Sequence, residues 1–257
     1  MNFILFKHFA KKNAILWFVF AFLMTFYFVV VALAFLMSPE AMNESMGIVG
    51  ADINTNSVVT FTAFTFFDFV VPVYATVFYV IFAILLVHRT VATNSLASYL
   101  SMGIPRKNYI TTAGTFLILV VSSVFFLQFA IGAILFRSVY GAFNVWNFFN
   151  VTLMSFLCTM TVAMVSFFFS TAFAGKTLGM GLVVGAPVLF VLLMMLSSLT
   201  PPLEFLKYLT PFGWFDSVRV VTGSFKLWYL VDLGYLAITA SLFVASIFIF
   251  NRKQLSI

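Results

Sequence analysis

Six long apolar runs constrain this chain more than any other feature of its sequence. They cover about residues 15–37, 66–87, 112–136, 148–173, 179–200 and 231–250. A helix needs about 20 apolar residues to cross the hydrocarbon core of a bilayer, and runs this long without polar alternation exclude a β-barrel. We therefore predict an all-α membrane protein, in which a single domain with six transmembrane helices occupies residues 1–257.

The amino-acid composition agrees with a lipid environment. Hydrophobic residues make up 63% of the chain and charged residues 8%, whereas a soluble domain carries about 25% charged residues. The single cysteine, Cys158, lies inside an apolar run, so we expect a packing role and no disulfide. The first apolar run is too long for the core of a signal peptide, and we interpret it as a retained span.

The basic residues divide unequally between the two sides that six spans define. The side of the termini carries nine of them: Lys7, Lys11, Lys12, Arg89, Arg106, Lys107, Lys176, Arg252 and Lys253. The other side carries four: Arg137, Lys207, Arg219 and Lys226. By the positive-inside rule, we expect both termini on the cytoplasmic side of a bacterial plasma membrane. The net charge of +6 then reflects topology, and we expect no nucleic-acid partner.

Residues 2–12 have the pattern of a helix that lies on the inner leaflet. Leu5, Phe6 and Phe9 share one face. The opposite face carries the cations Lys7, Lys11 and Lys12 beside His8. This pattern predicts contact with membrane lipid and its headgroups. The alternative is a charged flank that only anchors the first span.

The cytoplasmic loop 88–111 contains the pattern of a short amphipathic helix. Ala92, Leu96, Tyr99 and Leu100 recur at helical spacing, and Gly103 with Pro105 ends the helix. The other face, with Thr93, Asn94, Ser98 and Ser101, carries no charge. Helices that lie on lipid usually present Lys or Arg there, so we favour docking on a partner protein.

The segment 201–230 is broken by prolines into pieces too short to span. We expect two short helices that dip into the outer half of the membrane or lie at its surface, beside Trp214, Trp228 and Tyr229. The acidic outer loop 38–65 is long enough for a small cap. All seven acidic residues of the chain fall on this outer side.

No motif for catalysis, cofactor binding or metal binding is recognisable in the sequence. Gly175-Lys176-Thr177 resembles the end of a phosphate-binding loop, but Ser170 stands where that motif needs glycine, so we predict a tight hairpin. His8 and His88 have no metal-ligand neighbours. The small residues Gly175, Gly179, Gly181 and Gly185 predict close helix packing, within the chain or across a dimer.

Charges are missing from the interiors of the predicted spans. Asp68 and Asp232 fall near outer ends, and Gln128 is the most polar residue that is clearly interior. Ion-coupled carriers retain intramembrane charges as relays. The sequence therefore disfavours an ion-coupled secondary transporter or channel, which stays as an alternative, as does a membrane enzyme or scaffold.

The order of these elements resembles the permease subunits of type-2 ATP-binding-cassette (ABC) exporters. The resemblance rests on three segments: His88-Arg89 through Leu96 with Gly103-Ile104-Pro105-Arg106 and Tyr109, Thr200-Pro201-Pro202-Leu203 through Pro211-Phe212 with Arg219, and the terminal Phe250-Asn251-Arg252-Lys253-Gln254-Leu255. It covers nearly the whole chain. His88 and Thr90 depart from the family, which often has acidic residues there.

The resemblance implies a partner architecture. It gives loop 88–111 the role of a coupling loop, segment 201–230 that of an extracellular re-entrant segment, and this chain the role of a non-enzymatic transport subunit. The partners implied are a cytoplasmic ABC ATPase that holds Mg-ATP and a second permease copy or paralogue. The residues expected to contact the ATPase are Thr93, Asn94, Leu96, Tyr99, Leu100, Met102, Pro105 and Arg106. Charged residues in place of Leu96 and Tyr99 are then expected to uncouple transport without unfolding the spans.

The general sequence is most similar to the permeases of phenol-soluble-modulin exporters. That likeness implies an amphipathic, membrane-active helical peptide as cargo. An exporter of drugs or lipids is the alternative within the same family.

Overall fold

The computed structural model describes residues 2–37, 55–141 and 143–253, and over these ranges it is helical, without a strand. Six helices are long and apolar enough to cross a membrane, which confirms the predicted number of spans. They are Phe3–Phe35, Val58–Ala92, Arg106–Val139, Val145–Ala172, Leu178–Ser197 and Trp228–Arg252. Residues 38–54 of the predicted outer loop 38–65 lie outside the described residues.

The helical elements follow one another with short connections. The first span is α1 (Phe3–Met37). The second is formed by α3 (Thr55–Thr62), η1 (Ala63–Val70), α4 (Val71–Ala83), η2 (Ile84–His88) and α5 (Arg89–Ala92). The short helix α6 (Ser95–Ser101) follows, and the third span is formed by α7 (Arg106–Leu135) and η3 (Phe136–Tyr140). The last three are α8 (Val145–Ala172), α9 (Thr177–Ser197) and α11 (Trp228–Arg252), with η4 (Pro201–Leu209), η5 (Pro211–Trp214) and α10 (Ser217–Val221) between the last two.

The fourth span, α8, is the centre of the bundle. It packs against α11, α9, α4 and α7, while α1 packs mainly on α7. Buried Phe rings fill the space where these helices meet. The Phe136 ring packs edge to face against Phe28 and Phe148, and the rings of Phe28 and Phe148 are tilted against each other. Gly132 lets the rings approach, because a Cβ there would lie 2.6 Å from Cζ of Phe148. The interior is therefore held by aromatic packing.

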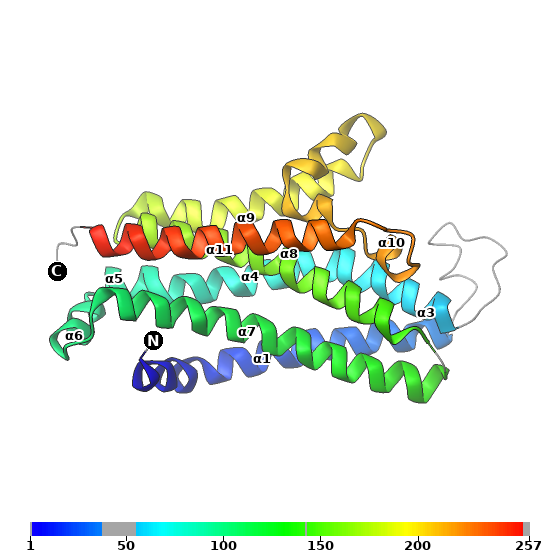
Figure 1. Cartoon of the computed structure of the whole chain (residues 1–257), viewed down its shortest axis with the longest axis horizontal. Helices are drawn as coiled ribbons and strands as arrows, with labels where there is room; N and C mark the ends of the chain where they lie inside the picture. Colours follow the sequence, from blue (N-terminus) through cyan, green and yellow to red (C-terminus); the bar gives the residue numbers. More distant parts are fainter. Residues whose placement is uncertain (1, 38–54, 142, 254–257) are drawn as a thin grey trace.

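The bundle has two distinct ends (Figure 1). Both termini, α5 and α6 lie at one end, which we call the termini end, and α3 and α10 lie at the other, which we call the α3 end. The arrangement agrees with an even number of spans. Of the four acidic residues in the described ranges, Asp68, Glu204, Asp216 and Asp232, none lies within residues 2–12, 88–111, 173–176 or 251–253, the segments at the termini end.

At two places the structure adds detail to the sequence prediction. Residues 3–12 continue without a break into the first span, and Leu5 and Phe9 are buried, with the Phe9 ring against Phe116 of α7. The predicted separate interfacial helix is thus part of α1, and its buried apolar side faces protein. Between α9 and α11, the prolines start two 3₁₀ helices, η4 and η5, which project sideways from the bundle in Figure 1.

Candidate functional site

The candidate site is the surface that α6 forms at the termini end. Asn94 precedes α6 with a φ of 54°, a left-handed conformation that asparagine tolerates, and turns the chain sharply after α5. Gly103, at φ +78°, ends the helix, and Pro105 is extended and starts α7. A short helix therefore lies where the sequence predicts an amphipathic one, and both of its ends have local causes in the sequence.

One face of α6 is fixed to the bundle. Leu96 is 1% exposed and belongs to the main core. The ring of Tyr99 lies 5.6 Å from that of Tyr109 on α7. The Tyr109 hydroxyl in turn donates a hydrogen bond to the carbonyl oxygen of Leu86 in η2, at 2.6 Å. Because these contacts join α6 to α7 and η2, the loop helix is a rigid extension of the second and third spans.

Tyr99 also reaches the first span. Its hydroxyl is hydrogen-bonded to Nε2 of His8 at 3.1 Å, and the two rings meet edge to face. Partial burial raises the pKa of Tyr99 above its ordinary value, so the phenol stays protonated at neutral pH. The position of α6 is thus set by α1, α7 and η2 together.

The opposite face of α6 is exposed. Its exposed residues are Thr93, Asn94, Ser98, Ser101 and Met102. Met102 is 73% exposed, so its apolar side chain is accessible on this face. Of the predicted contact residues, the structure exposes Thr93, Asn94, Met102 and Pro105, leaves Tyr99, Leu100 and Arg106 partly buried, and buries Leu96.

This placement corrects one sequence-based expectation. A charge at Leu96 would enter the chain's own core, so the variant would test folding rather than docking. The residues that can meet another protein without rearrangement are those around Met102.

A second network closes the termini end. Nζ of Lys253, just after α11, donates to the carbonyl oxygens of Ala172 and Ala174 at 3.0 and 2.9 Å. Arg106 donates from Nη1 to the carbonyl oxygen of Lys253 at 2.8 Å. Burial and the nearby charge of Lys176 lower the pKa of Lys253. Sequence reasoning missed this network, and its only signal was a lysine at the end of the last span, where it can bond the free carbonyls of a neighbouring helix.

The four glycines of the predicted packing stripe fall into three groups. Gly175 forms the hairpin turn with a φ of +79°. Gly179 packs so closely on Phe173 that a Cβ would overlap its carbonyl oxygen. Gly181 and Gly185 have no atom within 4 Å of a Cβ placed there. The last two therefore face away from the rest of the chain.

The described residues contain no group of three or more His, Cys, Asp or Glu side chains that could hold a metal ion. Cys158 is buried in α8, with no disulfide partner. The exposed face of α6 at this end of the molecule carries no charged side chain. No family model, no curated protein and no solved structure matches the chain.

Proposed function

We propose that this chain is the permease subunit of an ATP-driven ABC exporter, with its termini end in the bacterial cytoplasm. The observation that carries the proposal is the two-sided environment of α6, in which Leu96 is buried in the bundle while Met102 is exposed. When a partner protein moves against its exposed face, a helix held this way transmits the movement to the spans. The partner is a cytoplasmic ATPase, which holds Mg-ATP and supplies all of the nucleotide chemistry.

Three contacts support a mechanical role for α6. Tyr99 joins the helix to His8 on α1 and to Tyr109 on α7, and Tyr109 bonds the backbone of η2. Movement of α6 therefore acts on the first three spans at once. η2 is a π-helix, a geometry that often occurs at functional sites.

The cargo and the second subunit belong to the same proposal. The surface of α9 is largely apolar and exposed, and Gly181 and Gly185 leave room on it for the backbone of another helix. A second permease copy or a paralogue packed there would create a route between the two chains. We propose an amphipathic helical peptide as cargo, with drugs or lipids as the alternative.

The decisive experiment measures ATP hydrolysis in proteoliposomes by the chain together with the ATPase that co-purifies with it. Met102→Glu is expected to abolish co-purification and peptide-stimulated hydrolysis. Leu199→Glu, at a position exposed to a similar degree beyond α9, is the matched control and is expected to behave as the wild type. Equal hydrolysis by both variants would refute docking at α6.

Asp232 favours a second candidate function, a proton-coupled carrier. The residue lies in the last span, is 6% exposed, and both of its carboxyl oxygens are buried without a hydrogen-bond partner among the described residues. Buried carboxyl groups within spans mark proton relays in carriers. Peptide transport in liposomes that have a pH gradient but no ATP, lost in Asp232→Asn, would establish the carrier and displace the ATP-driven proposal.

A further inference from the structure

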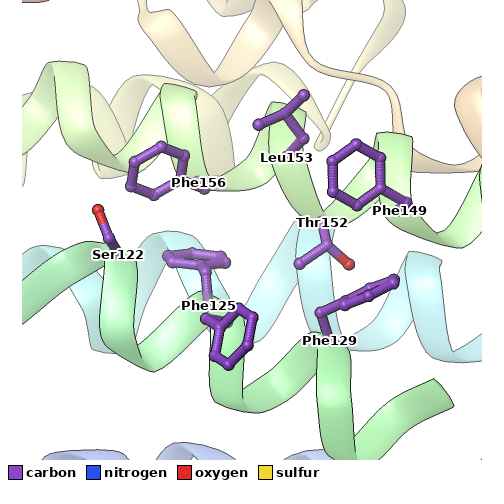
Figure 2. A pocket seen from close by; sticks show the side chains of 8 residues that line it. Ser122, Phe125, Phe129, Phe149, Thr152, Leu153 and Phe156 are labelled. Atoms are coloured by element: carbon purple, nitrogen blue, oxygen red, sulfur yellow. The ribbon is translucent and has the colours of Figure 1, made fainter.

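A hollow on the surface of the bundle lies between α7 and α8. Its volume is about 230 Å³, and Figure 2 shows the Phe125 and Phe129 rings of α7 facing those of Phe149 and Phe156 of α8 across it. Ser122, Phe126, Thr152 and Leu153 complete the lining. All of these residues belong to the third and fourth of the helices that are long and apolar enough to cross a membrane, so we expect the hollow to face the bilayer.

The lining selects an apolar occupant. Its two hydroxyl groups are already used, because Ser122 donates to the carbonyl oxygen of Ile118 and Thr152 to that of Phe148. Phe126 is 74% exposed at the edge of the hollow, which is therefore open to the surrounding bilayer. A hydrocarbon chain meets these conditions, whereas a polar group would gain no hydrogen-bond donor there.

A cationic side chain, that of Arg137, lies beyond the hollow toward the α3 end. Arg137 is exposed, and no ion pair of this residue is found within the described ranges. It follows Phe126 by about three helical turns, so the two side chains lie on about the same side of the third span. Trp146 precedes the hollow-lining Phe149 by three residues on the fourth span, where it is exposed and stacks on Phe149 at 5.7 Å. Tryptophan favours the headgroup level of a bilayer.

The spacing of these groups fits the dimensions of a lipid. Three helical turns separate Arg137 from Phe126 by ~16 Å along the span. One leaflet contributes ~15 Å of the hydrocarbon thickness. Arg137 therefore lies at the level of the headgroups when the hollow lies near the membrane midplane.

We propose that the α7–α8 hollow and Arg137 form one binding site for an anionic glycerophospholipid of the leaflet at the α3 end. An acyl chain fills the hollow, and the guanidinium of Arg137 binds the phosphate. Complementary charge favours this occupant over a second copy of the chain, because a lipid phosphate meets the exposed guanidinium of Arg137 while its acyl chain meets the uncharged lining of the hollow. The site depends only on membrane insertion, and it stands whether or not the chain is an exporter.

The test is native mass spectrometry of the delipidated full chain titrated with phosphatidylglycerol. We expect the first phosphatidylglycerol molecule to bind at a lower lipid concentration than any further molecule. Arg137→Gln is expected to weaken this event about tenfold, the effect of losing a hydrogen bond to a charged group. Lys226→Gln removes another exposed cation near the same end and is expected to leave it unchanged.

A second pair of variants tests the hollow itself. Ser122→Phe places a ring in the hollow and is expected to abolish tight binding. Leu233→Phe places the same ring on the exposed surface of α11 and is expected to have no effect. If Ser122→Phe does not fold, diacylglycerol, which has no phosphate, replaces it as a probe. We expect the wild type to bind diacylglycerol weakly and Arg137→Gln to bind it equally.

Three results would overturn the site. The first is equal binding of phosphatidylglycerol by Arg137→Gln and Lys226→Gln, which would mean that the lipid contacts the surface of the protein generally and has no specific site there. The second is tight binding of diacylglycerol. The third is occupation of the hollow by an added amphipathic peptide in place of phosphatidylglycerol.

Discussion

The hydroxyl of Ser217 donates a hydrogen bond to Oδ2 of Asp68 at 2.7 Å, and the N–H of Ser217 lies 3.3 Å from Oδ1. This contact joins the second span to the segment between α9 and α11. Asn147 of α8 adds a bond from Nδ2 to the carbonyl oxygen of Val221 at 2.7 Å, and the Tyr235 hydroxyl of α11 donates to that of Pro211 at 2.5 Å. Three spans thus hold this segment in place.

The first prediction concerns this attachment. Asp68→Ala removes an acceptor of two hydrogen bonds and leaves the Ser217 hydroxyl without its partner, so we expect the unfolding free energy to fall by about 2 kcal/mol. Thermal unfolding in detergent measures the loss. A cysteine at the buried position 220 should also react faster with a maleimide in the Asp68→Ala background, with little reaction at buried Cys158.

Glu204→Ala is the control for this prediction. Glu204 is exposed, and among the described residues its ion pair is with Lys207, three residues away, so its removal is expected to change little. Equal labelling of position 220 with and without Asp68 would show that the other attachments suffice.

The spans could be predicted from the sequence because a bilayer imposes one requirement, about 20 apolar residues, on each of them. The Asp68–Ser217 contact could not, because its partners are far apart in the chain and their approach depends on how whole helices pack. The same holds for the hydrogen bond from Tyr109 to Leu86 in η2, which joins the third span to the second. The burial of Leu96 was missed for a related reason, since helical spacing shows which residues share a face but not what covers it.

The second prediction separates the two faces of α6. Leu96→Ala is expected to lower the unfolding free energy by about 2–4 kcal/mol, because it leaves a cavity in a packed core. Met102→Ala is expected to stay within about 0.5 kcal/mol of the wild type, because the side chain is exposed. Chemical unfolding followed by circular dichroism measures both. A large loss for Met102→Ala would mean that Met102 packs within the chain after all.

The third prediction compares two glycines in spans. Gly132→Ala is expected to cost about 1–3 kcal/mol, since its Cβ would lie 2.6 Å from the Phe148 ring and 2.8 Å from that of Phe28. Gly185→Ala meets no atom within 4 Å and is expected to be neutral or slightly stabilising. Thermal unfolding of the monomer in detergent measures both effects. If Gly185→Ala destabilises a larger assembly and not the monomer, that difference would locate a helix–helix interface on α9.

The fourth prediction concerns pH and Lys253. Burial, with help from the charge of Lys176, lowers the pKa of Lys253 below its ordinary value of 10.5. Between the lowered value and 10.5, the unfolded chain binds one more proton at this side chain than the folded chain does. The unfolding free energy should therefore rise with pH across this window. The neutral amine can still donate to the carbonyl oxygens of Ala172 and Ala174, so the contact survives deprotonation.

Lys253→Arg isolates this effect, because a guanidinium stays charged throughout the window. The stability of the wild type relative to Lys253→Arg should increase as the pH approaches 10.5, when unfolding is measured at a series of alkaline pH values. Lys176→Gln removes the neighbouring charge and should shift the start of the increase to higher pH. If the difference between wild type and Lys253→Arg stays constant with pH, the ammonium of Lys253 is as well solvated in the folded chain as in the unfolded one.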